Sequence, residues 1–208
     1  MASASIHPRA ARTRAALLAA GFDLLVERPI DAIPIDDVVA RAGVAKGSFF
    51  NHFADKRAFA EAIATDVRLE VEALITRANA GVADPVERIA GGMLVGARFA
   101  ISQPKRTMVL LRSQATSTSP AHPLNRGLRD DMAAACAQGL LRPQARNSGV
   151  LYWLGLCQIL MVSLMEERPA EADLATRVAE MIVLGLTGLG VEPGRAAEMA
   201  QRQAGRIA

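Results

Sequence analysis

Apolar residues recur every three to four positions along most of the chain, which is the spacing that places them on one face of a helix. No run of alternating β-branched residues indicates a strand. A first helix is predicted over about residues 9–27, and Arg28-Pro29 ends it because a residue before proline disfavours the helical conformation. The pattern predicts an all-α fold. The inward face of the first helix is predicted to carry Ala16, Leu17, Ala20, Leu24 and Leu25.

Two short helices and a long one are predicted next. The first spans residues 36–42 and is followed by Gly43, at the position where a chain leaving a helix favours positive φ. The second spans about residues 46–50, and the long helix begins near Ala54 or Asp55. Two short helices joined by a tight turn that contains glycine form a helix-turn-helix, whose second helix enters the major groove of DNA.

Longer and more apolar helices are predicted beyond Gly81. Asp84-Pro85 begins one of them with an N-cap residue and a first-turn proline. The Arg- and Ala-rich tail from Glu192 is expected to be loosely held. The chain thus divides into a helix-turn-helix domain over residues 1–60 and a larger helical domain over residues 61–208. Further helices are predicted over about residues 105–113, 124–141, 144–167 and 171–189, with a polar loop over 113–123.

The most apolar run, VLYWLGLCQILMVSLM over residues 150–165, raises the question of a membrane span. It is shorter than the ~20 residues that a spanning helix needs, and Gln158 and Ser163 interrupt it. A helix that is buried on more than one side fits this pattern better. We therefore expect no membrane association.

Composition and charge narrow the class of protein. Hydrophobic residues make up 51% of the chain, which excludes general disorder, and the net charge of +3 permits an anionic partner without requiring one. Cys136 and Cys157 stand in apolar surroundings without CxxC or metal-ligand spacing, and the polar, basic N-terminus contains no secretory signal. We therefore expect free thiols and a cytoplasmic location.

The second short helix carries side chains that suit DNA. Lys46 opens this helix and can reach a phosphate or a guanine edge, while Gly47 lets the backbone come close to the duplex. Ser48 and Asn51 offer hydroxyl and amide groups for bases or phosphates. These residue types predict a recognition helix.

Four of the six phenylalanines lie between residues 49 and 59, next to these polar groups. We expect Phe49 to touch a thymine methyl, and Phe50 and Phe53 to anchor the short helix to its neighbours. The aromatic residues are thus expected to form mainly the core of a small three-helix domain. His52 and Lys56 lie near the N-terminus of the next helix, where backbone N–H groups and the helix dipole favour phosphate.

The stretch DDVVARAGVAKGSFFNHFADKRAF, residues 36–59, resembles the DNA-binding signature of TetR-family transcriptional regulators, and the likeness extends over about residues 9–60. The resemblance implies that the N-terminal domain binds double-stranded operator DNA. It also implies that the C-terminal domain binds an unknown small effector and forms a homodimer through the last two long helices. A ligand-responsive regulator is expected, most simply a repressor on a roughly palindromic operator. Carried over position by position, the DNA-facing residues are Lys46, Gly47, Ser48, Phe49, Asn51, His52 and Lys56.

Three sites depart from the family's pattern. The family usually has hydroxyl residues just before the helix at 36–42, where Ile33 and Pro34 stand in this chain. A serine commonly caps the recognition helix, but Ala45 replaces it and removes a cap of ~1 kcal/mol. A tyrosine often contacts phosphate at the position of Phe50, whose ring has no hydroxyl. Each change removes one polar contact.

Effector pockets are mostly apolar with a few placed polar groups, and large side chains of the C-terminal domain suit such a lining. Arg98 and Arg112 would pair with a ligand carboxylate if buried, and would be ordinary surface charges if exposed. For the apolar candidates, a place in the core or in a dimer interface is the commoner outcome. The candidate ligand-binding residues are Met93, Arg98, Phe99, Met108, Arg112, Trp153, Cys157 and Met161.

Catalysis and metal binding have little support in the sequence. Motifs such as GxSxG, HExxH and the phosphate loop are absent, and the three histidines are scattered. We expect neither an enzyme nor a metal or cofactor site. Two other classes remain open. A helical ligand-binding or protein-interaction module without DNA-binding activity predicts no salt-dependent binding to DNA. A cofactor-free helical enzyme predicts titratable groups that converge in the C-terminal domain.

Overall fold

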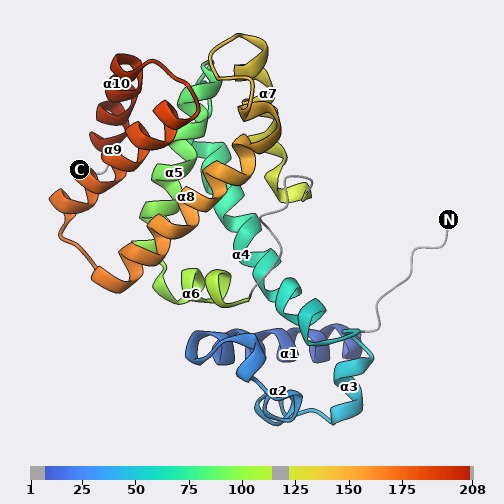
Figure 1. Cartoon of the computed structure of the whole chain (residues 1–208). Coiled ribbons are helices and arrows are strands. Elements are labelled where there is room, and N and C mark those ends of the chain that lie inside the picture. Colours follow the sequence, from blue (N-terminus) through green and yellow to red (C-terminus); the bar gives the residue numbers. More distant parts are fainter. Residues whose placement is uncertain (1–7, 114–121, 207–208) are drawn as a thin grey trace. The chain divides into compact units, whose positions relative to one another are not determined.

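The computed structural model describes residues 8–113 and 122–206, and these residues form helices without a strand (Figure 1). This confirms the all-α prediction. In chain order the elements are α1 (Pro8–Glu27), the 3-10 turn η1 (Ile30–Ala32), α2 (Ile35–Ala42), α3 (Lys46–Phe50), α4 (Lys56–Ala78), α5 (Pro85–Ser102), α6 (Pro104–Arg112), the 3-10 turn η2 (Pro123–Asn125), α7 (Arg126–Ala137), α8 (Ala145–Glu167), α9 (Glu171–Gly188) and α10 (Pro193–Ala204).

The helices belong to two compact units. Among the described residues, the first unit comprises 8–68 and 108–113, and the second comprises 69–107 and 122–206. The first unit therefore contains α1 to α3, the N-terminal part of α4 and the C-terminal part of α6. Both α4 and α6 begin in one unit and end in the other.

A close helix contact organises the core of the first unit. Gly21 of α1 faces α4 so closely that an added Cβ would lie 2.2 Å from Cζ of Phe59 and 2.6 Å from Cδ1 of Ile63. Leu17 and Leu24, on the same side of α1, are buried as the apolar pattern predicted. Glycine is thus required at residue 21 because a larger side chain would push α1 away from Phe59 and Ile63 of α4.

The second unit is built around one hydrophobic core, to which α5, α7, α8, α9 and α10 contribute. Trp153 of α8, the only tryptophan in the chain, is almost completely buried. Gly185 of α9 allows this packing, because an added Cβ would lie 2.6 Å from Cζ3 of Trp153. A glycine on α9 therefore accommodates the indole ring on the neighbouring helix α8.

The C-terminal tail corrects one sequence prediction. Residues from Glu192 were expected to be loosely held, but Pro193–Ala204 form α10, whose inner face joins the core. The Glu192 carboxylate caps this helix by accepting the N–H groups of Gly194 and Arg195 at 2.9 and 2.8 Å. These two hydrogen bonds lower the pKa of Glu192. Glu192 as the capping residue and Pro193 after it are sequence signals for the start of a helix. The prediction gave more weight to the many Arg and Ala residues that follow them.

Another correction concerns α7, which was predicted over 124–141 and is shorter. The helix ends at Ala137, and Gly139 then adopts φ 69°. A left-handed residue of this kind ends a helix, and glycine adopts it without strain. Leu141, which had been placed on the helix, is buried against the core after the turn.

Asp84, the N-cap residue of α5, forms an ion pair with Arg195 of α10. Because this carboxylate can be protonated, the stability of the fold is expected to depend on pH. Its carboxylate accepts the N–H of Val86 at 2.9 Å and a guanidinium N–H of Arg195 at 2.7 Å. Partial burial raises the pKa of Asp84, but the hydrogen bonds from Arg195 and Val86 outweigh burial, so the pKa lies below its ordinary value. A carboxyl group with a lowered pKa in the folded state stabilises that state above its unfolded pKa of ~3.9, and the contribution is lost as the pH falls through the folded pKa.

We therefore expect Asp84→Asn to flatten the acid side of the stability profile. The amide can still cap α5 but cannot form the ion pair with Arg195. Urea unfolding between pH 3 and 7, followed by the fluorescence of Trp153, would measure the free energy of unfolding for both proteins. The difference between them should be largest near neutral pH and shrink as Asp84 becomes protonated. Parallel profiles would show that Asp84 does not contribute in this way.

Candidate nucleic-acid interface

The turn between α2 and α3 has the geometry that the sequence predicted. Gly43 follows α2 with φ 67° and ψ 33°, a left-handed conformation that glycine adopts without strain. The N–H of Val44 then donates to the carbonyl of Val39 at 3.0 Å, which completes the helix end. Ala45 stands at the N-cap of α3 and provides no side-chain hydrogen bond. The helix-turn-helix is therefore formed by backbone geometry and packing rather than by a hydroxyl cap.

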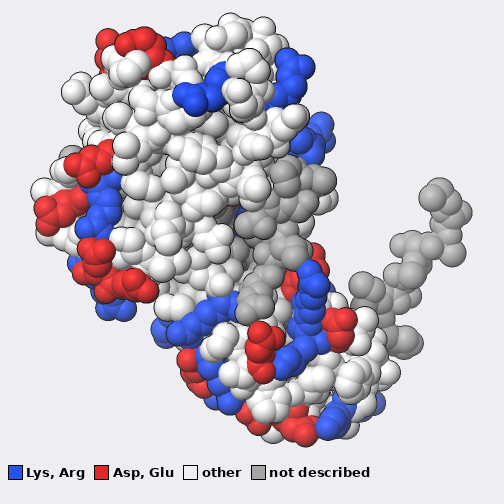
Figure 2. Space-filling view, viewed as in Figure 1, with Lys and Arg blue, Asp and Glu red and all other residues white. Residues whose placement is uncertain are grey.

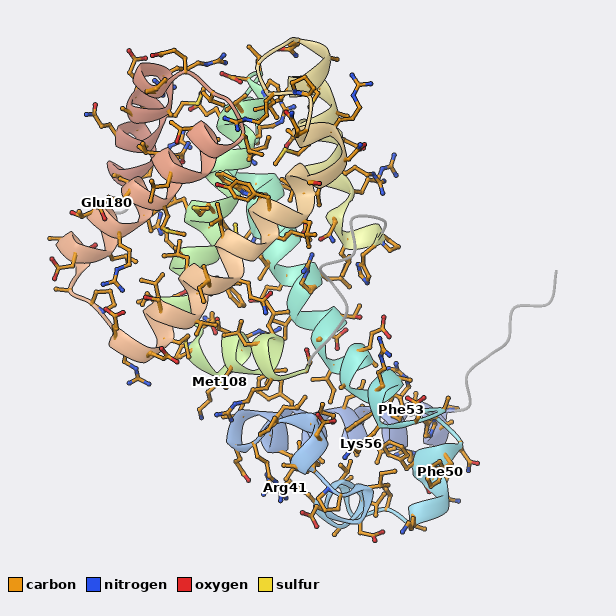
Figure 3. All side chains as sticks on the ribbon, in the orientation of Figure 1. Arg41, Phe50, Phe53, Lys56, Met108 and Glu180 are labelled. Carbon is orange, nitrogen blue, oxygen red and sulfur yellow. The ribbon has the colours of Figure 1, made fainter. Side chains whose placement is uncertain are left out.

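Three aromatic rings anchor the short helix α3. The ring centroid of Phe49 lies 5.6 Å from that of Phe53 and 5.1 Å from that of Phe59, and Phe53 and Phe59 are 4.9 Å apart. All three rings are buried (Figure 3 labels Phe53). A five-residue helix cannot be stable alone, so this cluster holds α3 against α4.

The exposures of the two adjacent rings, Phe49 and Phe50, differ from the roles predicted for them. Phe49 is 0% exposed and occupies the aromatic cluster, so its ring has no surface left for a thymine methyl. Phe50, expected to be an anchor, is 54% exposed (Figure 3). Successive residues of a helix point ~100° apart, and α3 is rotated so that Phe49 faces inward. The apolar side chain that α3 presents to solvent is therefore Phe50.

Two lysines predicted to contact DNA have partners within the first unit. The ammonium of Lys46 lies 2.8 Å from a carboxylate oxygen of Asp36 in α2, and both side chains are well exposed. Exposed ion pairs of this kind contribute little stability, so phosphate can compete for Lys46. The ammonium of Lys56 donates to the backbone carbonyl of Asp31 at 3.0 Å and so ties the start of α4 to η1 (Figure 3 labels Lys56).

The remaining polar candidates lie beside α1. Ser48, Asn51 and His52 line an open hollow of about 420 Å³ together with residues from the first turns of α1, among them Arg9 and Thr13. Arg14 of α1 lies with its guanidinium 5.4 Å from the centre of the Phe53 ring. The structure thus adds Thr13 to the surface around the recognition helix. Thr13 and Arg9 are four residues apart and so lie on one face of α1. This spacing was the feature of the sequence from which the position of Thr13 could have been predicted.

The candidate effector residues do not gather in one place. Arg98 is exposed and donates to the backbone carbonyl of Arg206 at 2.9 Å. Arg112 belongs to the first unit, where it donates to the carbonyl of Val26 at 2.5 Å at the C-terminus of α1. Both guanidinium groups therefore have protein partners, and their role toward a ligand stays a prediction.

The apolar effector candidates are mostly parts of the core. Met93 and Trp153 belong to the core of the second unit, and Cys157 packs against it in a half-buried position. Met161 is half-buried on α8, and its sulfur would lie 3.9 Å from a Cβ at Gly96 of α5. Of the two remaining candidates, Phe99 is buried and Met108 is half-buried (Figure 3 labels Met108).

Residues 8–113 and 122–206 were also compared with the requirements of a metal site and of a membrane-spanning helix. No group of three or more His, Cys, Asp or Glu in this part of the chain is arranged to hold a metal ion. In the same part, α8 is the one helix whose length and apolar composition would suit a membrane span, which is weak evidence because core helices of soluble proteins pass the same test.

Comparison with known proteins finds a match to a family model in the N-terminal region. A family model described as "Bacterial regulatory proteins, tetR family" matches residues 17–63. This match runs from the middle of α1 into α4 and includes the helix-turn-helix and the aromatic cluster. No curated protein matches the chain.

Solved structures share the fold over most of the chain. A protein from Shewanella sp. PV-4 that is described as a tetR family transcription regulator aligns with a TM-score of 0.73, at 16% identity over 85% of this chain and 97% of that chain. NalD, the secondary repressor of the MexAB-OprM multidrug efflux pump in Pseudomonas aeruginosa, aligns with a TM-score of 0.64, at 20% identity over 86% and 98%. RolR in complex with its ligand resorcinol aligns with a TM-score of 0.58, at 22% identity over 93% and 95%.

Proposed function

Because this chain belongs to the TetR family of bacterial regulatory proteins, we propose that it is a ligand-responsive repressor that binds a roughly palindromic operator as a homodimer. The observation that carries this proposal is the first unit itself. It holds α3 against α4 through buried aromatic rings and leaves Lys46, Asn51 and Phe50 at the surface. Such a helix supplies base-edge and phosphate contacts in a major groove.

A homodimer through α8 and α9 is part of the proposal, and the surface of α8 supports it. One side of α8 is buried in the core, whereas Leu151 and Ile159 are exposed on the other side, as is Leu184 on α9. Figure 2 shows an area without Lys, Arg, Asp or Glu over the middle of α8. Exposed apolar surface that is continuous over a helix is typical of an interface. Gly155, with no atom within 4 Å of its Cβ position, leaves room for a partner helix.

Two copies of α3 in such a dimer would enter successive major grooves. Their separation would match one helical turn of about 34–36 Å or a multiple of it. The dimer doubles every phosphate contact, which strengthens both the affinity and its dependence on salt. The two-fold symmetry of the protein is the reason to expect an inverted repeat in the operator.

A small effector is proposed to bind the second unit and release the operator. NalD is a repressor and RolR binds resorcinol, which makes a small organic effector a reasonable class for this chain. An effector must bind the non-operator-bound state more tightly in order to shift the equilibrium. The route into the first unit would run through α4 and α6, which belong to both units. The hydrogen bond from Arg112 to Val26 would connect the end of α6 to α1.

The proposal is tested by fluorescence anisotropy on a duplex from just upstream of the protein's own gene, with a scrambled duplex as the control. Preferential binding that weakens steeply with salt is the expected result. Equal and weak binding to both duplexes would move the test to a selection from random duplexes. Failure to enrich any site there would favour the ligand-binding or protein-interaction module over a regulator.

Substitutions of the two ion-paired residues, Lys46 and Asp36, are expected to change the affinity for the operator in opposite directions. Lys46→Ala should weaken operator binding and lower the slope of log K against log salt by about 1.8 for the two copies in a dimer. Asp36→Asn should strengthen binding severalfold, because it removes a carboxylate that repels phosphate and competes for Lys46. Anisotropy titrations at several salt concentrations measure both effects.

A matched control and a double variant make this test specific. Asp66→Asn removes an exposed carboxylate from α4 and should leave the affinity nearly unchanged. If Asp36 acts through Lys46, Asp36→Asn should have a smaller effect in the Lys46→Ala background. Equal effects in both backgrounds would mean that Asp36 acts only through its general charge, and no loss in Lys46→Ala would remove Lys46 from the interface.

A further inference from the structure

Phe50 is the only phenylalanine among the described residues that is exposed to solvent. Its ring packs edge-to-face on Phe49, with centroids 5.4 Å apart and an interplanar angle of 80°. Phe49 is in turn fixed by Phe53 and Phe59. The exposed ring is thus held in place from below, and this pre-organisation reduces the conformational entropy that a contact would cost.

The neighbours of Phe50 on α3 suit a partner that is anionic overall and locally apolar. Lys46 and Gly47 precede it by four and three residues and therefore share its side of the helix. Lys46 brings a cation, whereas Gly47 has no atom within 4 Å of its Cβ position and leaves the approach to the ring open. A phenyl ring has no hydrogen-bond donor, so Phe50 cannot bind a phosphate oxygen as a tyrosine hydroxyl would.

We propose that Phe50 determines part of the operator specificity by contacting the C5-methyl group of a thymine in each half-site. The major groove presents this methyl group as the apolar feature of a thymine, and aromatic side chains are suited to contact it. Phosphates flank every base, so a phosphate near the apolar contact is available to Lys46, which shares the side of α3 that carries Phe50. This inference rests on the proposed operator binding and assigns one base contact within it.

Uracil substitution tests the contact because it removes only the methyl group. The experiment uses a duplex that the full-length protein prefers over a scrambled version, with thymines replaced by uracil one symmetric pair at a time. Loss of a buried methyl group weakens binding about fourfold per half-site, or about sixteenfold for a symmetric pair. We expect one symmetric pair to show this loss with the wild-type protein. The same pair should show no loss with Phe50→Ala, whose affinity for the thymine duplex is already reduced to a similar extent.

Two further variants separate this role from a general effect of exposed apolar surface. Phe50→Leu keeps an apolar side chain and should retain part of the sensitivity to uracil. Leu69→Ala removes a side chain of α4 that is 51% exposed and should leave both the affinity and the uracil effect unchanged. Circular dichroism of each variant verifies that the helices are intact.

The outcomes distinguish this inference from the proposed function. If the wild-type protein prefers a duplex but no uracil pair weakens binding, or if Phe50→Ala loses affinity equally on thymine and uracil duplexes, the methyl contact is wrong while operator binding stands. A preferred operator without thymine in its half-sites would also contradict it. If no duplex is preferred over its scrambled version, operator binding itself fails, and the inference fails with it.

Discussion

Ile159→Asp is expected to convert the homodimer into monomers and to weaken operator binding about 10²- to 10⁴-fold, the range that loss of bivalent attachment produces. Ile159 is 58% exposed near the middle of α8, within the apolar surface proposed as the dimer interface. A carboxylate placed there would be desolvated against a partner helix without a counter-ion, which disfavours association. The fold of the monomer should survive, because the substitution lies on the outer side of α8.

Light scattering after size-exclusion chromatography measures this effect, and anisotropy measures the affinity for DNA. Leu69→Asp is the matched control, because Leu69 is similarly exposed but lies on α4, outside the proposed interface. The control should remain dimeric and bind normally. A dimeric Ile159→Asp protein would place the interface elsewhere, and a monomer that bound the operator at full strength would separate dimerisation from DNA binding.

Phe49→Ala is expected to destabilise the first unit by about 3–5 kcal/mol, the usual cost of removing a fully buried phenylalanine. The ring is 0% exposed and contacts three other rings, so alanine would leave a cavity in the cluster that supports α3. Binding to the operator should fall as well, because α3 would lose its support. Phe50→Ala should change the stability by only ~0.5 kcal/mol, since its ring is exposed.

Amide hydrogen exchange read by peptide is the suitable measurement, because it reports opening of α1 to α4 separately from the second unit. Peptides from the first unit should lose protection in Phe49→Ala but not in Phe50→Ala. Peptides around Trp153 in the second unit provide an internal reference. Equal losses of protection in the two variants would contradict the assignment of the buried and exposed rings.

The helix-turn-helix was predictable because its signals are local. Gly43 marks the left-handed turn, and the polar and aromatic residues that follow it form a compact signature. The orientation of α3 was not predictable in the same way. A helix of five residues, Lys46–Phe50, makes less than two turns, so apolar periodicity cannot decide which of two adjacent phenylalanines faces inward. Packing against Phe53 and Phe59 decides it.

Partners that are distant in sequence were also beyond prediction. Arg98 and Arg112 were considered as contacts for a ligand carboxylate if buried, and as ordinary surface charges if exposed. Their hydrogen-bond partners, the carbonyls of Arg206 and Val26, stand 108 and 86 positions away in the chain. Only the folded arrangement brings these groups together. The pairing of Lys46 with Asp36 depends similarly on how α2 and α3 turn about Gly43.

The most direct test of sequence-specific operator binding is a selection of duplexes from a random library by the wild-type protein, with Lys46→Ala selected in parallel. The proposed function predicts that the wild-type protein enriches an inverted repeat whose half-site centres are one helical turn, about 10–10.5 base pairs, or a multiple apart. Lys46→Ala should enrich the same repeat weakly or not at all. Enrichment of no common sequence by the wild-type protein would contradict the assignment of this chain as an operator-binding regulator.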